Sequence, residues 1–435
     1  MLTYNSYIIM LVLLFCLTQV GYGQAPMKRI YATSQKTGGA LLHFANSPND
    51  AVDGKPYTYS TIGITLIGDV WQRLQFPTNL PAGTTVRIKI GTTGDILGLL
   101  GNILIQAYQN DTSIGNPISI GNLITLLAGE DQAEIVFIPT LSFNSIRIYS
   151  SGIKLGGGLK IYEAYYLAPS SPTPTDCDTP TDILYGSTGN IAGGLNAIES
   201  PYNAIDGNPI TYTTMRANVS AVGNRTHLTA LYNTTSHAND SVRIILQRPG
   251  ALLDATILSN NFRIRSLLDN TDNGYLLLNP SLLSLRLLTP GSDIQVLTYP
   301  IASPFNRLEI SLGGGLVNAL STLHVHEIQR IMAKPKVTAL NIENNSLIVC
   351  EGETTTLLIE NPESTHEYRW YTDLTESLPI HTGTQYILPQ AIGTFTYYVS
   401  KSYKGCTEES DRTQLLITVI SKPGSPHVTI TNTNN

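Results

Sequence analysis

A short motif occurs twice in this chain and constrains its fold more than any other feature. Residues 49–61 read NDAVDGKPYTYST and residues 202–214 read YNAIDGNPITYTT, so Asp53 and Asp206 occupy equivalent places. In each copy an apolar pair precedes Asp-Gly, where glycine adopts positive φ at no steric cost, and the following proline fixes its own φ. The motif predicts a strand that breaks into a tight turn, with oxygen atoms of the Asp and of a nearby Thr facing inward.

Further matches surround both copies in the same order. Residues 86–88 (VRI) recur as 242–244, and the Glu-containing segment 159–163 recurs as 323–327. An ordered set of matches at a slowly growing offset is expected from two homologous domains with loop insertions. We therefore predict one domain over 29–167, a Pro/Thr-rich linker over 168–181 and a second domain over 182–332.

The first of these domains shows short strand-like runs and no long helical pattern. β-branched and aromatic residues cluster or alternate between Gly, Pro, Asn and Asp, in the runs 85–90, 103–108, 133–138, 145–150 and 159–166. Such spacing favours an all-β antiparallel sandwich over alternating strands and helices. We read residues 218–239, which hold four Asn-x-Ser/Thr sites, as a long exposed rim loop.

Residues 1–23 are predicted to be a signal peptide. An apolar run over 7–20 ends in small residues before Gln24, and it is shorter than the roughly twenty residues that span a bilayer. The alternative is a retained or lipidated N-terminus. We therefore expect secretion or display on the cell surface, with no membrane insertion after signal cleavage.

The charge balance bears on partners. Charged residues make up 13% of the chain and the net charge is −6, with no basic cluster. Nucleic acid and anionic membranes, which require clustered basic residues, are therefore not expected as partners. Cys177 lies in the linker; we expect it to form an intermolecular disulfide, with modification or pairing onto a domain as alternatives.

Residues 337–420 form a different pattern. Cys350, Trp370 and Cys406 follow one another in the order of an immunoglobulin-like sandwich, in which the Trp packs on a disulfide. The alternative is two unrelated buried thiols. The remaining tail, 421–435, looks like a connector followed by the first strand of another module, so we expect residues 428–431 to be disordered and the protein to be a shortened relative of a longer one or held at the surface through its folded domains.

This third module resembles the Ig-like modules found in large surface proteins of Gram-negative gliding bacteria. The residues that carry the resemblance are CEGE at 350–353, RWY at 369–371, TYYVS at 396–400 and KGC at 404–406. The resemblance implies a spacer or presentation unit rather than a catalyst, and a location on the outer surface of a Gram-negative bacterium.

The duplicated domains resemble discoidin-like (coagulation-factor C-type) domains of the galactose-binding-like jelly-roll class. The resemblance rests on the motif at 50–58 and 203–211, the segment 71–76 and the glutamates at 163 and 327. It implies a structural Ca²⁺ in each domain, held by Asp53, Thr58 and Glu163 and by Asp206, Thr211 and Glu327. The chain departs from the family at Ser60 and Thr213, where a Trp is usual, and at His227, where the first domain has Trp71.

Calcium suits these residue types, because it takes six to eight hard oxygen ligands. The alternative is that Asp53 and Asp206 only cap their own turns. His324 and His326 share one strand face and are candidate zinc ligands, but the first domain has Lys160 and Tyr162 there, so we expect ordinary exposed strand histidines. No nucleophile, metalloprotease or phosphate-loop signature appears, and we expect no enzyme.

Two classes of function remain. The first is an adhesin-like binding protein that recognises glycan or another surface ligand through rim loops, with two copies giving avidity. The second is a structural stalk or matrix component of the cell envelope. An exposed aromatic platform would favour the first, and the candidates are Tyr57, Tyr59, Tyr202 and Tyr212.

Overall fold

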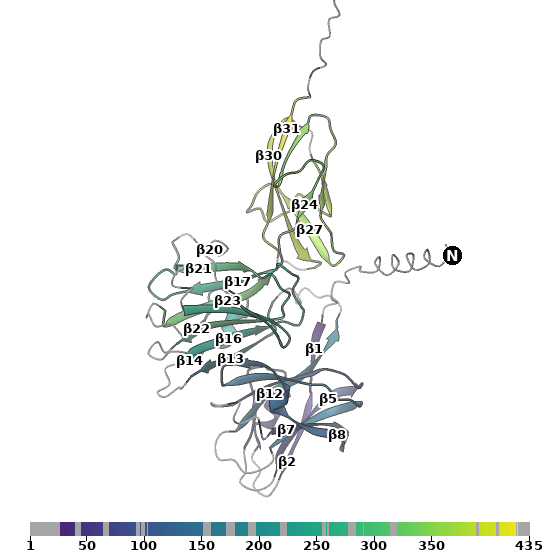
Figure 1. Ribbon diagram of the computed structural model, residues 1–435, viewed down its shortest axis with the longest axis vertical. Coiled ribbons are helices and arrows are strands. Elements are labelled where there is room, and N and C mark those ends of the chain that lie inside the picture. Colours follow the sequence, from purple (N-terminus) through teal and green to yellow (C-terminus); the bar gives the residue numbers. More distant parts are fainter. Residues whose placement is uncertain are drawn as a thin grey trace, which may run out of the picture. The chain divides into compact units, whose positions relative to one another are not determined.

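The computed structural model shows a chain built of strands and short turns (Figure 1). It describes residues 27–39, 45–63, 69–92, 96, 101, 103–150, 158–170, 179–189, 197–217, 224–254, 258, 261–276, 284–289, 291–313, 320–388, 391–405, 409–422 and 424. The predicted signal peptide, Cys177, Cys406 and residues 428–431 lie outside these ranges. Within the ranges, no helix has the length and apolarity needed to cross a membrane.

The first repeat folds into two antiparallel sheets that face each other across one core. The first sheet runs in the order β3 (Ala45–Asn46), β4 (Ser60–Ile62), β12 (Leu159–Pro169), β6 (Val86–Gly91), β10 (Gln132–Phe137) and β9 (Ile124–Ala128), with β1 (Met27–Tyr31) also paired to β12. The second runs β2 (Ser34–Gly39), β5 (Val70–Leu80), β11 (Phe143–Ser150), β7 (Ile103–Gln109) and β8 (Thr112–Ser119). The five strands predicted for this repeat are confirmed within three residues at each end.

The second repeat has the same two-layer arrangement. One sheet runs β14 (Ala197–Glu199), β15 (Thr213–Arg216), β23 (Thr322–Ile331), β17 (Ser241–Gln247), β21 (Ile294–Pro300) and β20 (Ser284–Leu287) (Figure 1). The other runs β13 (Asp182–Thr188), β16 (Arg225–Leu231), β22 (Arg307–Gly313), β18 (Phe262–Leu268) and β19 (Thr271–Leu276). Both repeats are thus jelly-roll sandwiches, and the closing strands β12 and β23 lie inside their sheets.

One expectation for the second repeat is wrong. Residues 218–239 do not form a single exposed loop, because Arg225–Leu231 is strand β16, whose seven residues are all buried. The strand lies between β13 and β22 and aligns Leu228 and Ala230 with the core. The density of Asn-x-Ser/Thr sites suggested a loop, but the alternation of Thr with Leu and Ala in this segment is a strand pattern.

Residues from both jelly rolls form a joint apolar cluster, which defines the seam between them. Its members are Leu126, Ala128, Leu184, Leu231 and Leu267. The turn after β9 approaches β13 closely, and the Glu130 N–H donates to Ser187 O at 2.7 Å. A Cβ on Gly186 would collide with Ala128 O, so only glycine permits this approach.

Buried ion pairs cross the same seam in both directions. Asp182 of the second jelly roll accepts from Lys89 Nζ at 2.9 Å and from Arg29 Nη1 at 3.3 Å, both of the first. Glu134 of the first accepts from Arg307 Nη2 of the second at 2.8 Å. Burial alone would raise the pKa of Glu134, but Arg307 and then Arg87 lower it to about 2. Each domain therefore places a carboxylate among cations of the other, which fixes the pair as one unit.

The C-terminal module is a separate sandwich with its own core around Trp370. Its three-stranded sheet comprises β24 (Val337–Thr338), β26 (Thr356–Ile359) and β29 (Gln385–Ile387). Its five-stranded sheet runs β25 (Ser346–Cys350), β31 (Thr413–Ile420), β30 (Gly393–Tyr403), β27 (His366–Tyr371) and β28 (His381–Thr382), with β25 and β31 parallel. The prediction of an all-β fold is confirmed for every module.

Candidate functional site

The two motif turns have the predicted conformation. Gly54 and Gly207 have φ of 75° and 74°, in the left-handed region that favours glycine. In the first turn Thr58 Oγ1 donates to Asp53 Oδ1 at 2.9 Å. In the second, Thr211 Oγ1 donates to Asp206 Oδ2 at 2.7 Å. The structure therefore brings the Asp and Thr of each predicted metal site together.

The Asp side chains also bond to their own turns. The Lys55 N–H donates to Asp53 Oδ1 at 2.9 Å, and the Asn208 N–H donates to Asp206 Oδ1 at the same distance. Both bonds are those of an Asx turn, which needs no metal. The turn geometry by itself therefore fits the capping role as well as the metal-binding role.

The environment of the closing-strand glutamate differs between the two copies. Glu327 is 3% exposed, and its Oε2 has no hydrogen-bond partner. Burial, and then the negative charge of Asp206, raise the pKa of Glu327 to about 8, while the Gly207 N–H opposes this. No basic side chain among the described residues forms an ion pair with it. A buried carboxylate that feels the charge of a second one, and that has one unpartnered oxygen and no ion pair, suits a bound divalent cation.

Glu163 has a different environment in the first jelly roll. Its Oε1 accepts from Arg29 Nη1 at 2.9 Å, and Lys89 lies opposite it on β6. Burial, and then the charge of Asp182, raise the pKa of Glu163 to about 7, although Arg29 and Lys89 lower it. No hydrogen bond or ion pair joins Glu163 to Asp53 among the described residues. Protein cations thus surround this carboxylate, although its Oε2, like that of Glu327, lacks a hydrogen-bond partner.

The four candidate tyrosines do not form one platform. Tyr57, Tyr59 and Tyr212 are 55%, 37% and 40% exposed, whereas the Tyr202 hydroxyl lies at the seam. Lys89 Nζ donates to that hydroxyl at 2.7 Å, and the ring of Tyr202 meets Tyr57 edge-on at 5.6 Å. Tyr202 therefore contributes to the joint between the domains.

Tyr59 and Tyr212 follow the two motif threonines and contact equivalent positions of the closing strands. Lys160 Nζ lies 4.6 Å from the centroid of the Tyr59 ring. In the second copy, Tyr212 stacks on His324 with centroids 4.0 Å apart. Each jelly roll thus presents a half-exposed aromatic ring whose orientation is fixed by a polar side chain of the closing strand.

The two strand histidines are not equally exposed. His324 is half-buried and its Nδ1 lies 3.2 Å from Gln247 Oε1, whereas His326 is buried and its Nδ1 lies 2.9 Å from Pro209 O. The expectation of exposed histidines is therefore wrong for His326. Burial lowers the pKa of both, and their mutual charge repulsion lowers that of His324 further. The pair packs under Tyr212 and holds its ring.

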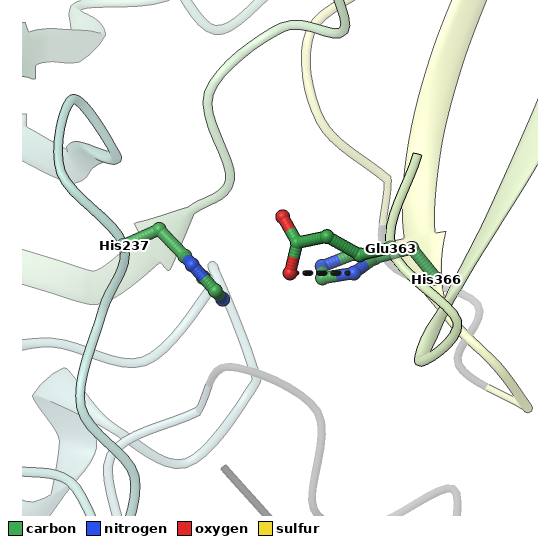
Figure 2. A group of neighbouring side chains, drawn as sticks. All are labelled: His237, Glu363 and His366. Atoms are coloured by element: carbon green, nitrogen blue, oxygen red, sulfur yellow. Dashed lines mark ion pairs between the residues drawn. The ribbon is translucent and has the colours of Figure 1, made fainter. Parts of the chain in front are cut away.

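In the C-terminal module, Trp370 is fully buried and donates from Nε1 to Gly383 O at 2.9 Å. Cys350 is half-buried at the end of β25, but Cys406 lies outside the described residues, so their disulfide stays a prediction. Glu363 Oε2 lies 3.5 Å from His366 Nδ1 in the turn that enters β27 (Figure 2). His366 also stacks on Tyr403, which indicates a packing role for this turn.

Comparison with protein families identifies the C-terminal module. Residues 335–420 match the family described as "Ig-like domain CHU_C associated". This match covers the module and not the jelly rolls. A search among curated proteins finds no match.

Among solved structures, the chain is similar to sugar-binding proteins and to an enzyme. It is 14% identical to an f-lectin (fucolectin) from striped bass (Morone saxatilis) serum, over 70% of this chain and 95% of the lectin, with a TM-score of 0.21. It is 12% identical to the family 32 CBM of C. perfringens NanJ in complex with galactose, over 32% and 100%, with a TM-score of 0.23. It is 9% identical to allantoicase from Saccharomyces cerevisiae, over 71% and 93%, with a TM-score of 0.26. These likenesses are too distant to transfer a ligand or an activity.

Proposed function

We propose that this chain is a non-catalytic, adhesin-like binding protein, secreted or held at the outer surface of a Gram-negative bacterium, that recognises glycan through its jelly rolls. The observation that carries the proposal is the equivalent placement of Tyr59 and Tyr212. Each ring is exposed on one side and fixed by Lys160 or His324 on the other. A fixed aromatic face next to polar groups suits a sugar ring, which is apolar on its C–H faces and polar at its edge.

The duplication adds to this function. Two weak sites on one rigid unit convert the second binding event into an intramolecular one, so a surface rich in repeated glycans is bound far more tightly than a free sugar. The Ig-like module then acts as a spacer or presentation unit. This division of roles agrees with the low charge of the chain, since glycan recognition relies on hydrogen bonds and stacking.

A structural cation in the second jelly roll is part of the proposal. Asp206, Thr211 and Glu327 supply the oxygen ligands. Their assignment is supported by the hydrogen bond between Thr211 and Asp206 and by the absence of an ion pair to Glu327 among the described residues. The corresponding set Asp53, Thr58 and Glu163 is the weaker candidate, because Arg29 already neutralises Glu163. The cation would stabilise the turn that precedes Tyr212 and take no part in chemistry.

A glycan array probed with the full chain tests the proposal. We expect binding to at least one glycan class, lost in the double variant Tyr59→Ala/Tyr212→Ala. Tyr275→Ala is the matched control, because Tyr275 is an exposed tyrosine on β19, away from the closing strands. Absence of binding to every glycan would overturn the proposal and favour the structural stalk.

A further inference from the structure

A cavity of about 330 Å³ opens at the seam between the two jelly rolls. The first jelly roll contributes Tyr59, Lys160 and Tyr162, and the second contributes Tyr185, Ser187 and Thr226. Neither copy of the repeat contains this pocket alone. Its size is at the lower end of the roughly 300–1,000 Å³ typical of small-molecule sites, which suits one or two sugar rings.

The wall from the first jelly roll is aromatic and cationic. The rings of Tyr59 and Tyr162 are tilted against each other with centroids 5.1 Å apart. Tyr162 is buried and packs against Tyr59, which is 37% exposed and lines the pocket. Lys160 lies over the Tyr59 ring and has no carboxylate partner among the described residues. Its ammonium group is therefore available to a hydroxyl oxygen of a ligand.

The polar groups at the bottom of the pocket are held in place from both sides of the seam. Gln132 Nε2 donates to the Tyr162 hydroxyl at 3.0 Å, and Gln132 Oε1 accepts from the Tyr185 N–H at 3.0 Å. Asp131 Oδ2 accepts from the Ser187 N–H at 2.8 Å and from its hydroxyl at 3.2 Å. These bonds, with the ion pairs of the seam, give a preformed pocket, and preformed sites bind at lower entropic cost.

One charged group of the lining has an acceptor left for a ligand. Asp131 Oδ1 accepts no hydrogen bond from the described residues, although Oδ2 accepts two from Ser187. Thr226 also lines the pocket, but it is 0% exposed, so its unpartnered Oγ1 is out of reach of a ligand in this structure. A cationic donor and a carboxylate acceptor beside an aromatic ring match the edge and the face of a pyranose.

We propose that this seam pocket binds one or two pyranose units of a neutral glycan. Tyr59 stacks on the ring, the Lys160 ammonium donates to one hydroxyl and Asp131 Oδ1 accepts from another. The inference rests on the proposed function and deepens it, because it assigns recognition to a site that exists only when the two copies are docked.

The equivalent place in the second copy has a different lining. Its closing strand carries His324 and His326 where the first has Lys160 and Tyr162, and Tyr212 is stacked flat on His324. The Tyr212 face is therefore a surface contact, while the Tyr59 face is one wall of a pocket. We expect the seam pocket to supply most of the affinity for a single sugar.

Titration calorimetry of the full chain with the methyl glycosides of galactose, glucose, mannose and N-acetylglucosamine tests the pocket. We expect at least one to bind, with Tyr59→Ala and Lys160→Met each weakening it tenfold or more. Tyr275→Ala should bind as the unchanged chain does.

Protection from amine acylation, read by mass spectrometry, gives a measurement on the unchanged chain. Bound glycoside should shield Lys160 and leave Lys36 reactive, because Lys36 is exposed on β2. If none of the four glycosides binds or shields Lys160, the pocket inference is overturned. If Tyr212→Ala alone abolishes binding to the glycan array, the proposed function stands and the pocket inference fails.

Discussion

The two jelly rolls share a strand order and a closing-strand glutamate, but they differ in what faces that glutamate. Glu163 on β12 lies opposite Lys89 on β6, whereas Glu327 on β23 lies opposite Ile245 on β17. In the first copy, the cation comes from the protein and also reaches Asp182 across the seam. In the second copy no described residue forms an ion pair with the glutamate, although one oxygen of the carboxylate, Oε2, lacks a hydrogen-bond partner in both copies.

The difference teaches how a duplicated domain can use one position in two ways. When the first copy docks on the second, its Glu163 region becomes internal and a lysine there joins the domains. The equivalent region of the second copy does not face the seam, so a lysine there would have no Asp182 to bind. An external cation can then serve the same carboxylate, because the requirement for charge compensation remains.

Replacing Lys89 by isoleucine, the residue at the equivalent position 245 of the second copy, should cause the largest loss of stability. Lys89→Ile leaves Asp182 and Glu163 with Arg29 as their remaining cation, and breaking a buried pair costs about 3–5 kcal/mol. Chemical denaturation of the full chain measures the loss for the jelly-roll pair. Lys36→Ile is the matched control, since its exposed ion pair with Asp111 is worth about 0–1 kcal/mol. A similarly small loss of stability for both variants would show that Arg29 alone compensates the charges of Asp182 and Glu163.

Calcium should stabilise the second jelly roll more than the first. At a concentration one hundred times Kd, a ligand specific for the folded state contributes about 2.7 kcal/mol and raises the Tm. We expect calorimetric scans with calcium and with EDTA to differ, and Glu327→Gln or Asp206→Asn to remove the difference. Asp53→Asn should retain it. Coincident scans of the unchanged chain would exclude the metal.

The calcium effect should depend on pH through Glu327. Its carboxyl has a pKa raised to about 8, so protons compete with the metal below that pH. We expect the apparent affinity to fall by up to about tenfold, or ~1.4 kcal/mol, for each pH unit below 8. Without metal the pH dependence of the folding stability is opposite. The pKa of Glu327 is 4.5 in the unfolded chain and about 8 in the folded one, so the folded state favours the protonated carboxyl and loses stability as pH rises from 4.5 towards 8. A pH-independent calcium affinity would place the metal away from Glu327.

Two threonine substitutions test whether each motif threonine only caps its turn or also binds a metal, and their expected effects on stability are small. Thr58→Val and Thr211→Val each remove a hydroxyl that donates to the motif Asp, which costs about 1 kcal/mol. With EDTA we expect equal losses in unfolding free energy for the two variants. With calcium the loss should be larger for Thr211→Val. Equal losses in both conditions would assign the threonines to the turns alone.

The stability of the chain at acid pH reports on Glu134 at the seam and not on the metal site. Arg307 and Arg87 lower the pKa of the buried Glu134 to about 2, from an unfolded value of 4.5. The carboxylate therefore contributes stability that is complete above pH 4.5 and is lost as pH falls towards 2. We expect Glu134→Gln to destabilise the jelly-roll pair at neutral pH and to flatten this acid dependence.

The sequence determined the local structure of this protein. Period-two patterns and turn residues are local properties, so the strands near residues 86–90 and 159–166 and the positive φ of Gly54 and Gly207 follow from short segments. The repeat also identified Tyr59 and Tyr212 as equivalent. Local patterns misled where two of them competed, as at Arg225–Leu231, where polar sites suggested a loop and the strand alternation prevailed.

The tertiary structure decided which of the equivalent residues share an environment. The structure brings together Lys89, Asp182 and Tyr202, which are far apart in the sequence. No sequence pattern in one copy predicts which residue of the other copy it contacts. Docking buries one face of the first copy and leaves the equivalent face of the second outside the seam. Burial raises the cost of an uncompensated charge. The closing-strand glutamate forms an ion pair with Arg29 in the first copy, whereas no described residue forms one with it in the second.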